Sequence, residues 1–327
     1  MGLMIRGKME DIKWVFVTGA CGGMGRAGVL ELRKRGYGVF ALDLFEGRDT
    51  KEQMISALGA EDGKRVAAGI GSEECCALGS DSEKHKVLFE DDGLIVPIKA
   101  SVTDEASLIR AKDMIKKKTD RLYAIVHFAG IYMLDSLVEM EDREFSRIFD
   151  INVRGAFLVN KTFIGQLQFG SRIIMVTSEL AVLDPLPFTG IYAVTKAALD
   201  KYAYSLRMEL QLLGISVSVL RAGAVDTGML GASMRALDSF VEDTRLYTCN
   251  AKKFKDIVER VEARNIKPET LAKKVLRIAE KKRPRFAYSI NRNPLLLLLN
   301  FMPKGFQLWV IRKILAEKKR KHTGEGK

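Results

Sequence analysis

Short apolar runs recur along the first 220 residues of the chain, and the segments between them carry apolar residues at helical spacing. The runs cover residues 14–18, 38–42, 94–98, 122–127, 172–177 and 215–220. Runs of this length predict buried β-strands, and a repeat of three to four positions predicts helices. Strands that alternate with helices indicate a parallel sheet covered on both faces. We therefore expect a single α/β domain with a doubly wound parallel sheet over roughly residues 10–255.

Two regions depart from this pattern. Residues 58–93 are rich in Gly, Ser, Glu and Asp, which predicts a surface insertion. The adjacent cysteines in that region, Cys75 and Cys76, are open to a metal or redox role, but their spacing favours incidental loop thiols. Residues 256–327 are expected to form a basic helical C-terminal extension outside the domain.

Composition changes the picture mainly through the position of the charge. Apolar residues make up 47% of the 327 residues, enough for a full core, so the chain is not intrinsically disordered. The net charge is +12, yet the segment from Leu271 to the end holds 16 bases and three acids, a balance of +13, which leaves −1 for the rest. Aromatic and basic residues are not interleaved in this tail, so we do not expect nucleic-acid binding.

The sequence shows no signal for export or membrane insertion. Its first residues hold no apolar run of signal-peptide length, and no run elsewhere is long enough for a transmembrane helix. Four cysteines in a chain of this length do not form a disulfide framework. We expect a cytoplasmic protein, and peripheral contact of its tail with a membrane surface stays open.

A glycine-rich turn follows the first predicted strand. Gly19, Gly23 and Gly25 stand where a strand ends and a helix begins, the position at which backbone amides bind the pyrophosphate of a dinucleotide. Asp43 ends the second strand, where a carboxylate accepts hydrogen bonds from the adenine ribose and repels a 2′-phosphate. This favours NAD over NADP. A tight turn and a capping role for Asp43 are the structural alternatives.

Tyr192 and Lys196 are four residues apart on a predicted helix, so their side chains share one face. A tyrosine has a pKa of about 10, so a catalytic phenolate at neutral pH needs roughly 4 kcal/mol of stabilisation. A neighbouring ammonium is a physical means of supplying it. Ser178, at the end of a preceding strand, is placed to hold a substrate oxygen by a hydrogen bond.

Together these motifs resemble those of the short-chain dehydrogenases/reductases, and they occur in that family's order. The matching residues are Thr18-Gly-x-x-x-Gly-x-Gly25, Asp43, His127-Phe-Ala-Gly130, Asn152, Ser178, Tyr192-x-x-x-Lys196 and Arg221-Ala-Gly-Ala-Val-Asp-Thr227. They span about 210 residues. The resemblance implies a Rossmann fold, hydride transfer between a nicotinamide and a substrate carbon, and a homo-oligomer.

The resemblance also implies roles for individual residues. Tyr192 would be the general acid/base, Lys196 would lower its pKa and bind the nicotinamide ribose, and Ser178 would orient the substrate. Asn152 would hold a water in a proton relay, and no metal is implied. The cofactor-binding residues would be Gly19, Gly23, Met24, Gly25, Asp43, Val102, Ala129, Gly130, Tyr192, Lys196 and Thr227.

The sequence departs from the family pattern at three positions. His127 replaces the usual first Asn of Asn-Asn-Ala-Gly, Ser101 replaces the acid before Val102, and Ala222 replaces a Pro. Adenine recognition and the rigidity of the loop before Thr227 are therefore altered, but no catalytic group is lost. Because the gap from Ser178 to Tyr192 is one residue longer than expected, Glu179 is an alternative for the serine's position.

The segments after Thr227 bear on the substrate and on location. Residues 228–254 include Met229, Leu230 and Phe240 among several apolar residues, which suits a lid over a hydrophobic alcohol or carbonyl such as a steroid, retinoid or lipid. Residues 294–321 combine an apolar helix with a basic end, which is typical of an interfacial helix on anionic lipid. Similar extensions occur in the retinol and hydroxysteroid branch of the family. Packing on the domain or on a partner subunit is the alternative.

The sequence thus predicts an NAD-dependent oxidoreductase that interconverts a hydrophobic alcohol and its carbonyl. Two alternatives stay open. One is a catalytically silent dinucleotide-binding or membrane-associated interaction protein on the same fold. The other is a nucleotide-sugar epimerase or dehydratase, which the apolar lid and tail fit poorly.

Overall fold

A computed structural model describes residues 12–44, 94–262 and 264–316. The predicted insertion at residues 58–93, with Cys75 and Cys76, lies outside the described residues, as does the basic end of the tail from residue 317 onward. Of the expected lid, the side chains of Met229 and Leu230 are also outside the description.

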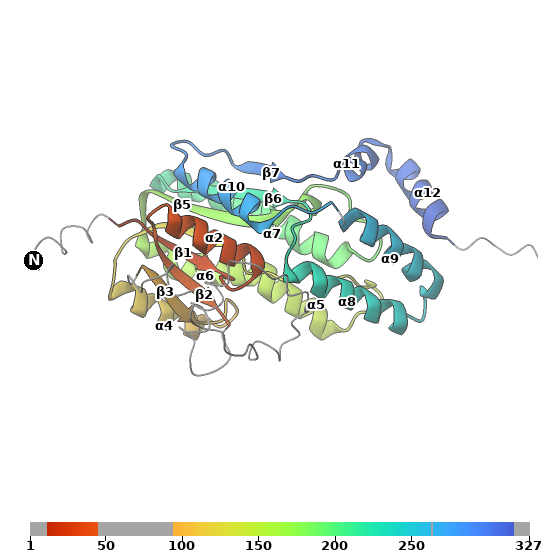
Figure 1. Ribbon diagram of the computed structural model, residues 1–327, viewed down its shortest axis with the longest axis horizontal. Helices are drawn as coiled ribbons and strands as arrows, with labels where there is room; N and C mark the ends of the chain where they lie inside the picture. The colour runs from red at the N-terminus through yellow and green to blue at the C-terminus, as the bar shows by residue number, and fades with distance from the viewer. Residues whose placement is uncertain (1–11, 45–93, 263, 317–327) are drawn as a thin grey trace, which may run out of the picture.

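Seven parallel strands form one sheet in the order β3-β2-β1-β4-β5-β6-β7 (Figure 1). The strands are β1 (Trp14–Thr18), β2 (Gly38–Asp43), β3 (Ile95–Lys99), β4 (Leu122–His127), β5 (Leu167–Ser178), β6 (Ser216–Ala222) and β7 (Ala287–Ile290). Each of the six predicted strands corresponds to one of the first six. The strand order reverses between β1 and β4, and in open parallel sheets ligands bind at the carboxyl ends of the strands beside such a reversal.

Ten helices follow or flank the strands in the described part of the chain. They are α2 (Gly23–Lys34), α4 (Glu105–Lys116), α5 (Asp142–Phe149), α6 (Gly155–Phe163), α7 (Gly190–Leu210), α8 (Gly228–Asp243), α9 (Thr248–Glu262), α10 (Pro268–Glu280), α11 (Pro294–Phe301) and α12 (Lys304–Leu315). The doubly wound Rossmann architecture expected from the sequence is confirmed.

Helices cover both faces of the sheet, which explains why the strands are apolar at consecutive positions. In β1, Trp14 and Phe16 point into a cluster shared with α4, α6 and α7. Val15 and Val17 point into a second cluster, shared with α2 and α10. Side chains alternate between the two faces of a strand, so a strand buried on both sides reads as one continuous apolar run.

The sheet continues past residue 255, where we expected the extension to begin. Helix α10 packs beside α2 and buries Leu271, Val275 and Ile278 against the sheet. Strand β7 then pairs with β6 and completes the sheet. The part of the chain that lies outside the sheet and its covering helices therefore starts after Ile290, because the intervening residues supply one strand and one covering helix.

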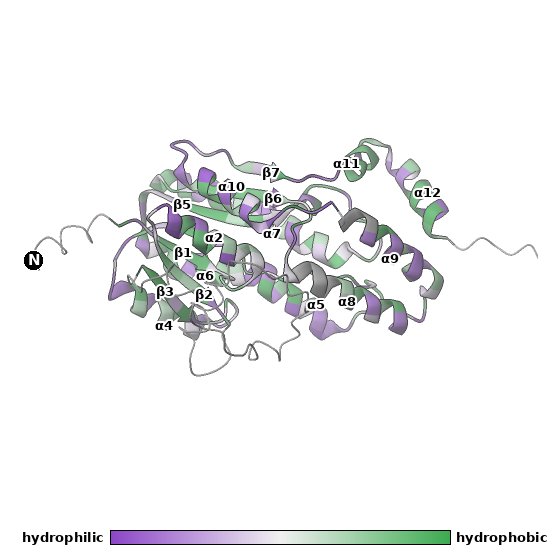
Figure 2. Ribbon diagram, in the orientation of Figure 1, coloured by the Kyte–Doolittle hydropathy of each residue, from purple (hydrophilic) through white to green (hydrophobic). Residues whose placement is uncertain are grey.

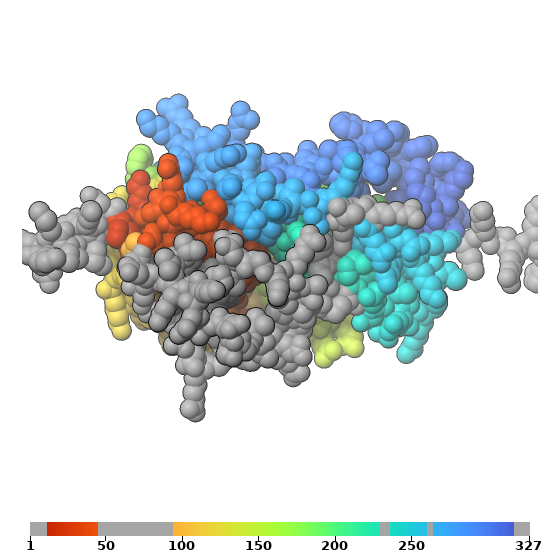
Figure 3. Space-filling view, viewed as in Figure 1, coloured from red at the N-terminus to blue at the C-terminus, as the bar shows by residue number. Residues whose placement is uncertain are grey.

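A third apolar cluster lies beyond the sheet, at the end of the molecule where α8 and α9 stand (Figure 1). Leu237 and Phe240 of α8 and Phe254 of α9 form its centre, and Leu315 of α12 is also buried in it. Helices α11 and α12 lie along the edge of the molecule next to α9 (Figure 3). No helix in the described part of the chain is long and apolar enough to cross a membrane.

Candidate active site

The glycine turn connects β1 to α2 and is shaped by contacts that exclude side chains. Gly19 has a φ of +67°, and a Cβ on it would lie 2.5 Å from the amide nitrogen of Ala129. A Cβ on Gly25 would lie 1.9 Å from the carbonyl oxygen of Gly19. Both positions therefore require glycine, which lets the turn pass directly under the end of β4.

The amino end of α2 opens at this turn without a side-chain cap. Its N-cap is Gly22, which makes no capping hydrogen bond, and the first turn contains no acidic residue. The amide groups of that turn are the kind of donors that an anionic phosphate accepts from at a helix N-terminus. Thr227 lies beside the same turn, because a Cβ on Gly23 would come within 3.0 Å of its side chain. The residues present fit the pyrophosphate of a dinucleotide.

Asp43 is held by the same turn. One carboxylate oxygen accepts a hydrogen bond of 2.7 Å from the amide of Cys21, and the other accepts one of 2.7 Å from the amide of Leu44. Burial raises the pKa of Asp43, and these backbone hydrogen bonds oppose the rise. The capping interpretation of Asp43 is thus observed, and each oxygen keeps a lone pair for a further donor.

The end of β4 meets Lys196 and Asn152. A Cβ on Gly130 would lie 3.2 Å from Nζ of Lys196 and 3.1 Å from Oδ1 of Asn152. Asn152 sits in a single π-helical turn, η1 (Asp150–Arg154), that joins α5 to α6. Its amide group accepts a hydrogen bond from the backbone nitrogen of Ile131 and donates to the backbone oxygen of Ile131 and to Thr195. Asn152 therefore ties the exit of β4 to α7.

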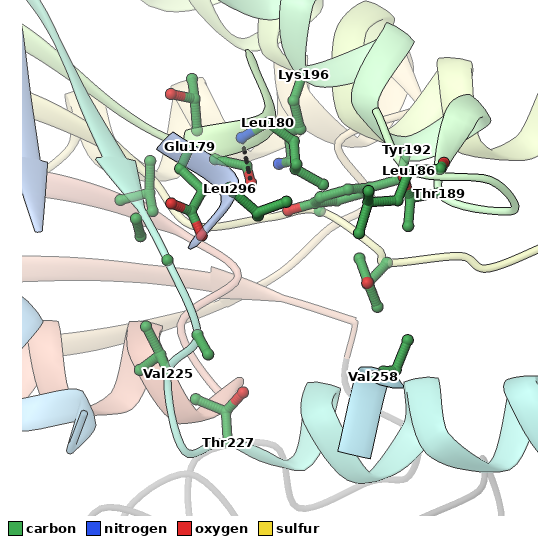
Figure 4. Close-up of a pocket in the computed structure, with 18 of the residues that line it drawn as sticks. Glu179, Leu180, Leu186, Thr189, Tyr192, Lys196, Val225, Thr227, Val258 and Leu296 are labelled. Atoms are coloured by element: carbon green, nitrogen blue, oxygen red, sulfur yellow. Dashed lines mark hydrogen bonds between the residues drawn. The ribbon is translucent and has the colours of Figure 1, made fainter. Parts of the chain in front are cut away.

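Tyr192, Lys196 and Ser178 meet where α7 begins and β5 ends (Figure 4). Nζ of Lys196 is 5.5 Å from the centre of the Tyr192 ring. The hydroxyl of Ser178 accepts a hydrogen bond of 3.2 Å from the backbone nitrogen of Leu180. Ser178 is 14 positions from Tyr192 and 18 from Lys196 in the sequence, and the fold brings all three residues to one wall of a cavity.

The pKa values of the pair differ from the sequence-based expectation. Burial raises the pKa of Tyr192 to about 12, although a hydrogen bond with Ser178 opposes the rise. Burial also lowers the pKa of Lys196 to about 8. Desolvation disfavours either charged form and is the main cause of both shifts. The protein's own groups therefore favour a protonated phenol.

The cavity above these residues has a volume of about 170 Å³ and mostly apolar walls. Phe254, Ile257 and Val258 of α9 and Leu296 of α11 belong to its lining. Figure 4 shows Val258 and Leu296 at different places around the cavity. The expected lid residue Phe240 does not reach the cavity and packs instead in the third apolar cluster. Among the described side chains, the apolar cover comes from α9 and α11, and it includes Phe254 at the end of the expected lid segment.

The sequence analysis did not name Tyr132 and Leu296 as residues of the site, and it named Glu179 only as an alternative to Ser178. Tyr132 stacks edge-on against Tyr192, with ring centres 4.5 Å apart. Glu179 is buried at the cavity, where its carboxylate accepts a hydrogen bond of 2.7 Å from the backbone nitrogen of Asn293. Leu296 comes from the tail. Only Glu179 carried a sequence signal, its position next to Ser178.

Two further candidates lie near the site without lining the cavity. Val102, in the loop after β3, packs against the start of α6, where a Cβ on Gly155 would lie 2.8 Å from its side chain. Asp43 stands at the opposite end of the glycine turn from Thr227. Both positions are at the carboxyl edge of the sheet. No group of His, Cys, Asp and Glu in the described residues is arranged to hold a metal ion.

Residues 55–237, more than half of the chain, match the sequence profile of the family described as short chain dehydrogenase. The chain belongs to this family. As a short-chain dehydrogenase it is an oxidoreductase that binds a nicotinamide cofactor.

Several curated relatives of this short-chain dehydrogenase are fungal reductases. Versicolorin reductase stcU from Emericella nidulans is 25% identical over 246 residues, which cover 75% of this chain and 78% of the relative. Trihydroxynaphthalene reductase PfmaI from Pestalotiopsis fici is 24% identical over 223 residues, covering 68% of each chain.

Solved structures share the fold of this short-chain dehydrogenase. A dehydrogenase/reductase from Sinorhizobium meliloti 1021 superposes with a TM-score of 0.61 at 22% identity, covering 87% of this chain and 97% of the other. A 3-ketoacyl-(acyl-carrier-protein) reductase from Brucella melitensis, complexed with NADH, gives 0.59 at 20% identity over 85% and 96%. ElxO with NADP bound gives 0.61 at 18% identity over 86% and 97%. Both forms of the cofactor thus occur on this fold.

Proposed function

We propose that the protein is a carbonyl reductase for apolar substrates, with Tyr192 as its proton donor. The observation that carries the proposal is the meeting of Tyr192, Ser178 and Lys196 on one wall of an apolar cavity, beside a turn suited to a dinucleotide. The reductase names of the curated relatives support the same class of reaction.

Tyr192 would carry its proton when a carbonyl substrate arrives. A reduction needs a phenol that carries its proton when the substrate arrives, and a pKa of about 12 keeps it protonated throughout the physiological range. Ser178 would donate a hydrogen bond to the substrate oxygen while Tyr192 gives that oxygen its proton. The bound nicotinamide would supply the hydride to the carbonyl carbon.

Lys196 would act on the phenolate that remains after proton transfer. Its ammonium is buried, and its pKa of about 8 leaves it largely protonated at pH 7. A cation beside the ring lowers the free energy of the phenolate and hence of the proton transfer that creates it. Asn152 would hold Lys196 at a fixed position relative to the end of β4, because its side chain forms hydrogen bonds with both Ile131 and Thr195.

The cofactor we propose is NAD in preference to NADP. Asp43 places a carboxylate at the end of β2, where it would accept from the ribose hydroxyls and repel a 2′-phosphate. No basic residue occurs among Ala20, Cys21 and Gly22 to attract that phosphate. Gly19, Gly23, Met24 and Gly25 would form the pyrophosphate side of the site, with Val102, Ala129, Gly130 and Thr227 around it.

The substrate class follows from the cavity walls. Beside the polar wall, Phe254, Ile257, Val258 and Leu296 offer only hydrocarbon and aromatic surface. Such walls fit a ketone or aldehyde with an apolar body, and they leave the sugar hydroxyls of a nucleotide sugar without hydrogen-bond partners. We also propose that the protein forms a homo-oligomer, as the family resemblance implies. Light scattering would measure its mass in solution.

The test is NADH consumption with a panel of apolar ketones and aldehydes, comparing wild type with Tyr192→Phe. We expect the variant to lose about 100-fold or more in kcat, the range for a general acid, while its Kd for NADH stays unchanged. Tyr204→Phe is the matched control, because Tyr204 lies on the same helix and is half exposed. Full activity of Tyr192→Phe would refute the mechanism. NADH binding without turnover of any substrate would favour a silent binding protein.

A further inference from the structure

Helices α11 and α12 expose an unusual concentration of large apolar side chains. Of the 23 large hydrophobic residues that are exposed in the described chain, eight fall between residues 295 and 314. They are Leu295, Leu298, Phe301, Met302, Phe306, Leu308, Trp309 and Ile314. Figure 2 shows α11 and much of α12 in the hydrophobic colour at the rim of the molecule. We call these eight residues the apical surface.

The apical surface is held in place by the rest of the protein. On its inner side Leu315 is buried in the third apolar cluster, against α9. The side chain of Asn300 accepts a hydrogen bond of 2.6 Å from the backbone nitrogen of Asp184. The side chain of Asp184 forms an ion pair with Lys304. Lys253 of α9 donates to the backbone oxygen of Ala316. The apolar side chains therefore stay exposed on a fixed support instead of folding inward.

The chain segment that bears the apical surface has charge of one sign, although Asp184 from outside this segment pairs with Lys304. Between Asn291 and Ala316 there is no acidic residue, whereas four positions are basic. Arg312 and Lys313 occupy the last turn of α12. The ammonium of Lys313 lies 4.8 Å from the centre of the Trp309 ring, so a base and an interfacial aromatic residue stand side by side. Tryptophan with lysine at the rim of an apolar face is typical of helices that lie in the headgroup region of a bilayer.

We propose that the apical surface docks onto a membrane that carries anionic lipids. The apolar side chains would enter the boundary of the acyl chains, and Arg312 and Lys313 would meet the lipid phosphates. A second copy of the chain is a poorer occupant. A twofold contact through the same surface would set Arg312 and Lys313 of one copy near those of the other, with no acid between residues 291 and 316 to compensate.

The position of α11 connects this surface with the cavity. Leu296 lines the cavity, while Leu295 and Leu298 on the same helix are exposed at the apical surface. Docking would therefore place the wall of the cavity next to the bilayer, where an apolar substrate is concentrated. This consequence rests on the proposed function, whereas the docking itself does not.

The experiment is co-sedimentation of the full-length protein with vesicles, in the absence of substrate. We expect binding to vesicles in which about a quarter of the phosphatidylcholine is replaced by phosphatidylserine, and at least tenfold weaker binding to phosphatidylcholine alone. Arg312→Ala with Lys313→Ala should weaken binding to the anionic vesicles about 25-fold, at roughly fivefold for each base.

The apolar part of the surface is tested with Phe301→Glu and Leu308→Glu in one protein. Both side chains are mostly exposed, at 85% and 68%, so folding should be unaffected while vesicle binding falls at least tenfold. The matched control is Leu212→Glu with Leu213→Glu, which adds the same charge at exposed leucines after α7 and should bind like wild type. Wild type that stays in the supernatant with both vesicles would overturn the proposal. So would a wild-type dimer that Phe301→Glu converts to monomer, because a second copy would then cover the surface.

The result is separable from the proposed function. Vesicle binding without turnover would leave the docking surface intact and refute only the reductase. Turnover of short, water-soluble carbonyls by a protein that binds no vesicles would support the reductase and refute the docking surface. If both hold, Phe301→Glu with Leu308→Glu should slow the reduction of a long-chain aldehyde loaded into vesicles and leave a short aldehyde in solution unaffected.

Discussion

Asp43 accepts hydrogen bonds from backbone amides of the glycine turn and of Leu44, and this determines what its substitution will do. Its oxygens accept from the amides of Cys21 and Leu44, so the carboxylate shapes the glycine turn, and in the proposed cofactor site it would also place negative charge beside the adenine ribose. An alanine would remove both effects together. An asparagine removes the charge and keeps one of the two accepting oxygens, so it disturbs the turn less than an alanine does.

We expect Asp43→Asn to reduce the preference for NADH over NADPH by about tenfold or more, because the repulsion of a 2′-phosphate at close range is worth a few kcal/mol. Asp43→Ala should in addition weaken NADH binding, since the turn loses an acceptor. The ratio of kcat/KM for the two cofactors is the measurement, with the unfolding temperature as a control for the turn. An unchanged ratio in Asp43→Asn would mean that this carboxylate does not select the cofactor.

His127 has a structural place in the fold. It is buried on β4, and its Nε2 forms a hydrogen bond of 2.9 Å with Oδ1 of Asn160, whose amide nitrogen donates in turn to Tyr202. Burial lowers the pKa of His127 to about 4, against an ordinary value of 6.5. The folded protein therefore holds this imidazole neutral under conditions in which the unfolded chain protonates it.

The stability of the fold should consequently fall in acid through His127. Between pH 6.5 and 4 the unfolded state binds the extra proton, so the free energy of unfolding decreases as the pH falls through this window, by about 3 kcal/mol in all. Above pH 6.5 the effect is absent. His127→Asn, which has no titrating group, should show a smaller loss between pH 7 and pH 4 in urea unfolding. Equal losses in the two proteins would show that His127 is not held neutral.

At the scale of elements, the position of α7 decides whether the site forms, since this helix carries Tyr192 and Lys196. An ion pair joins its middle to β6: Arg221 donates from two nitrogens to the two oxygens of Asp200, at 2.9 and 2.8 Å. Both side chains are largely buried, with 20% and 10% of their surface exposed. A two-pronged pair of this kind fixes both distance and angle between the elements.

Asp200→Ala should therefore destabilise the fold by about 3 kcal/mol, because it leaves the Arg221 guanidinium buried without its partner. Glu105→Ala is the control, since it breaks the pair between Glu105 and Lys161, whose side chains are about half exposed, and should cost less than about 1 kcal/mol. Chemical denaturation measures both. If both variants lost a similar free energy of unfolding, the pair between Asp200 and Arg221 would stabilise the fold no more than an exposed pair does.

At the scale of the whole molecule, the C-terminal part of the chain adds a strand and a covering helix to the sheet that the N-terminal part begins. Helix α10 packs on α2, and β7 pairs with β6, so residues more than 200 positions apart share one core. Asn291 then donates to the backbone oxygens of Ala224 and Arg264, and Glu179 accepts from Asn293. The tail is thereby attached to the loops that surround the cavity.

A chain that ends after Ile266 should not fold. It lacks the five buried apolar residues of α10, at about 1.5–3 kcal/mol for each of the larger side chains, which is comparable to the total stability of a domain. A chain that ends after Ala316 is the control and should unfold at the temperature of the full chain. Circular dichroism and thermal melts distinguish these outcomes, and a folded, cooperative chain ending at Ile266 would contradict the structure.

The elements of the fold were predictable because their causes are local. A strand buried on both faces is apolar at every position, as in Trp14–Thr18, and the end of α2 is marked by Gly36, which has a φ of +92°. Strand β7 was missed for a related reason. It is short, half-buried and preceded by Arg283 and Arg285, and its strand character comes from pairing with β6 instead of from its own pattern.

The chain's own sequence determined which residues have the chemistry for the site: the glycines that alone permit the turn, a phenol and an ammonium one helical turn apart, and a carboxylate at the end of a strand. The tertiary structure alone decided how much water reaches them and what surrounds them. Burial raises the pKa of Tyr192 and lowers that of Lys196, and Leu296 from the distant tail closes the cavity. Desolvation and long-range contact depend on the whole packed molecule, so no local pattern of residues encodes them.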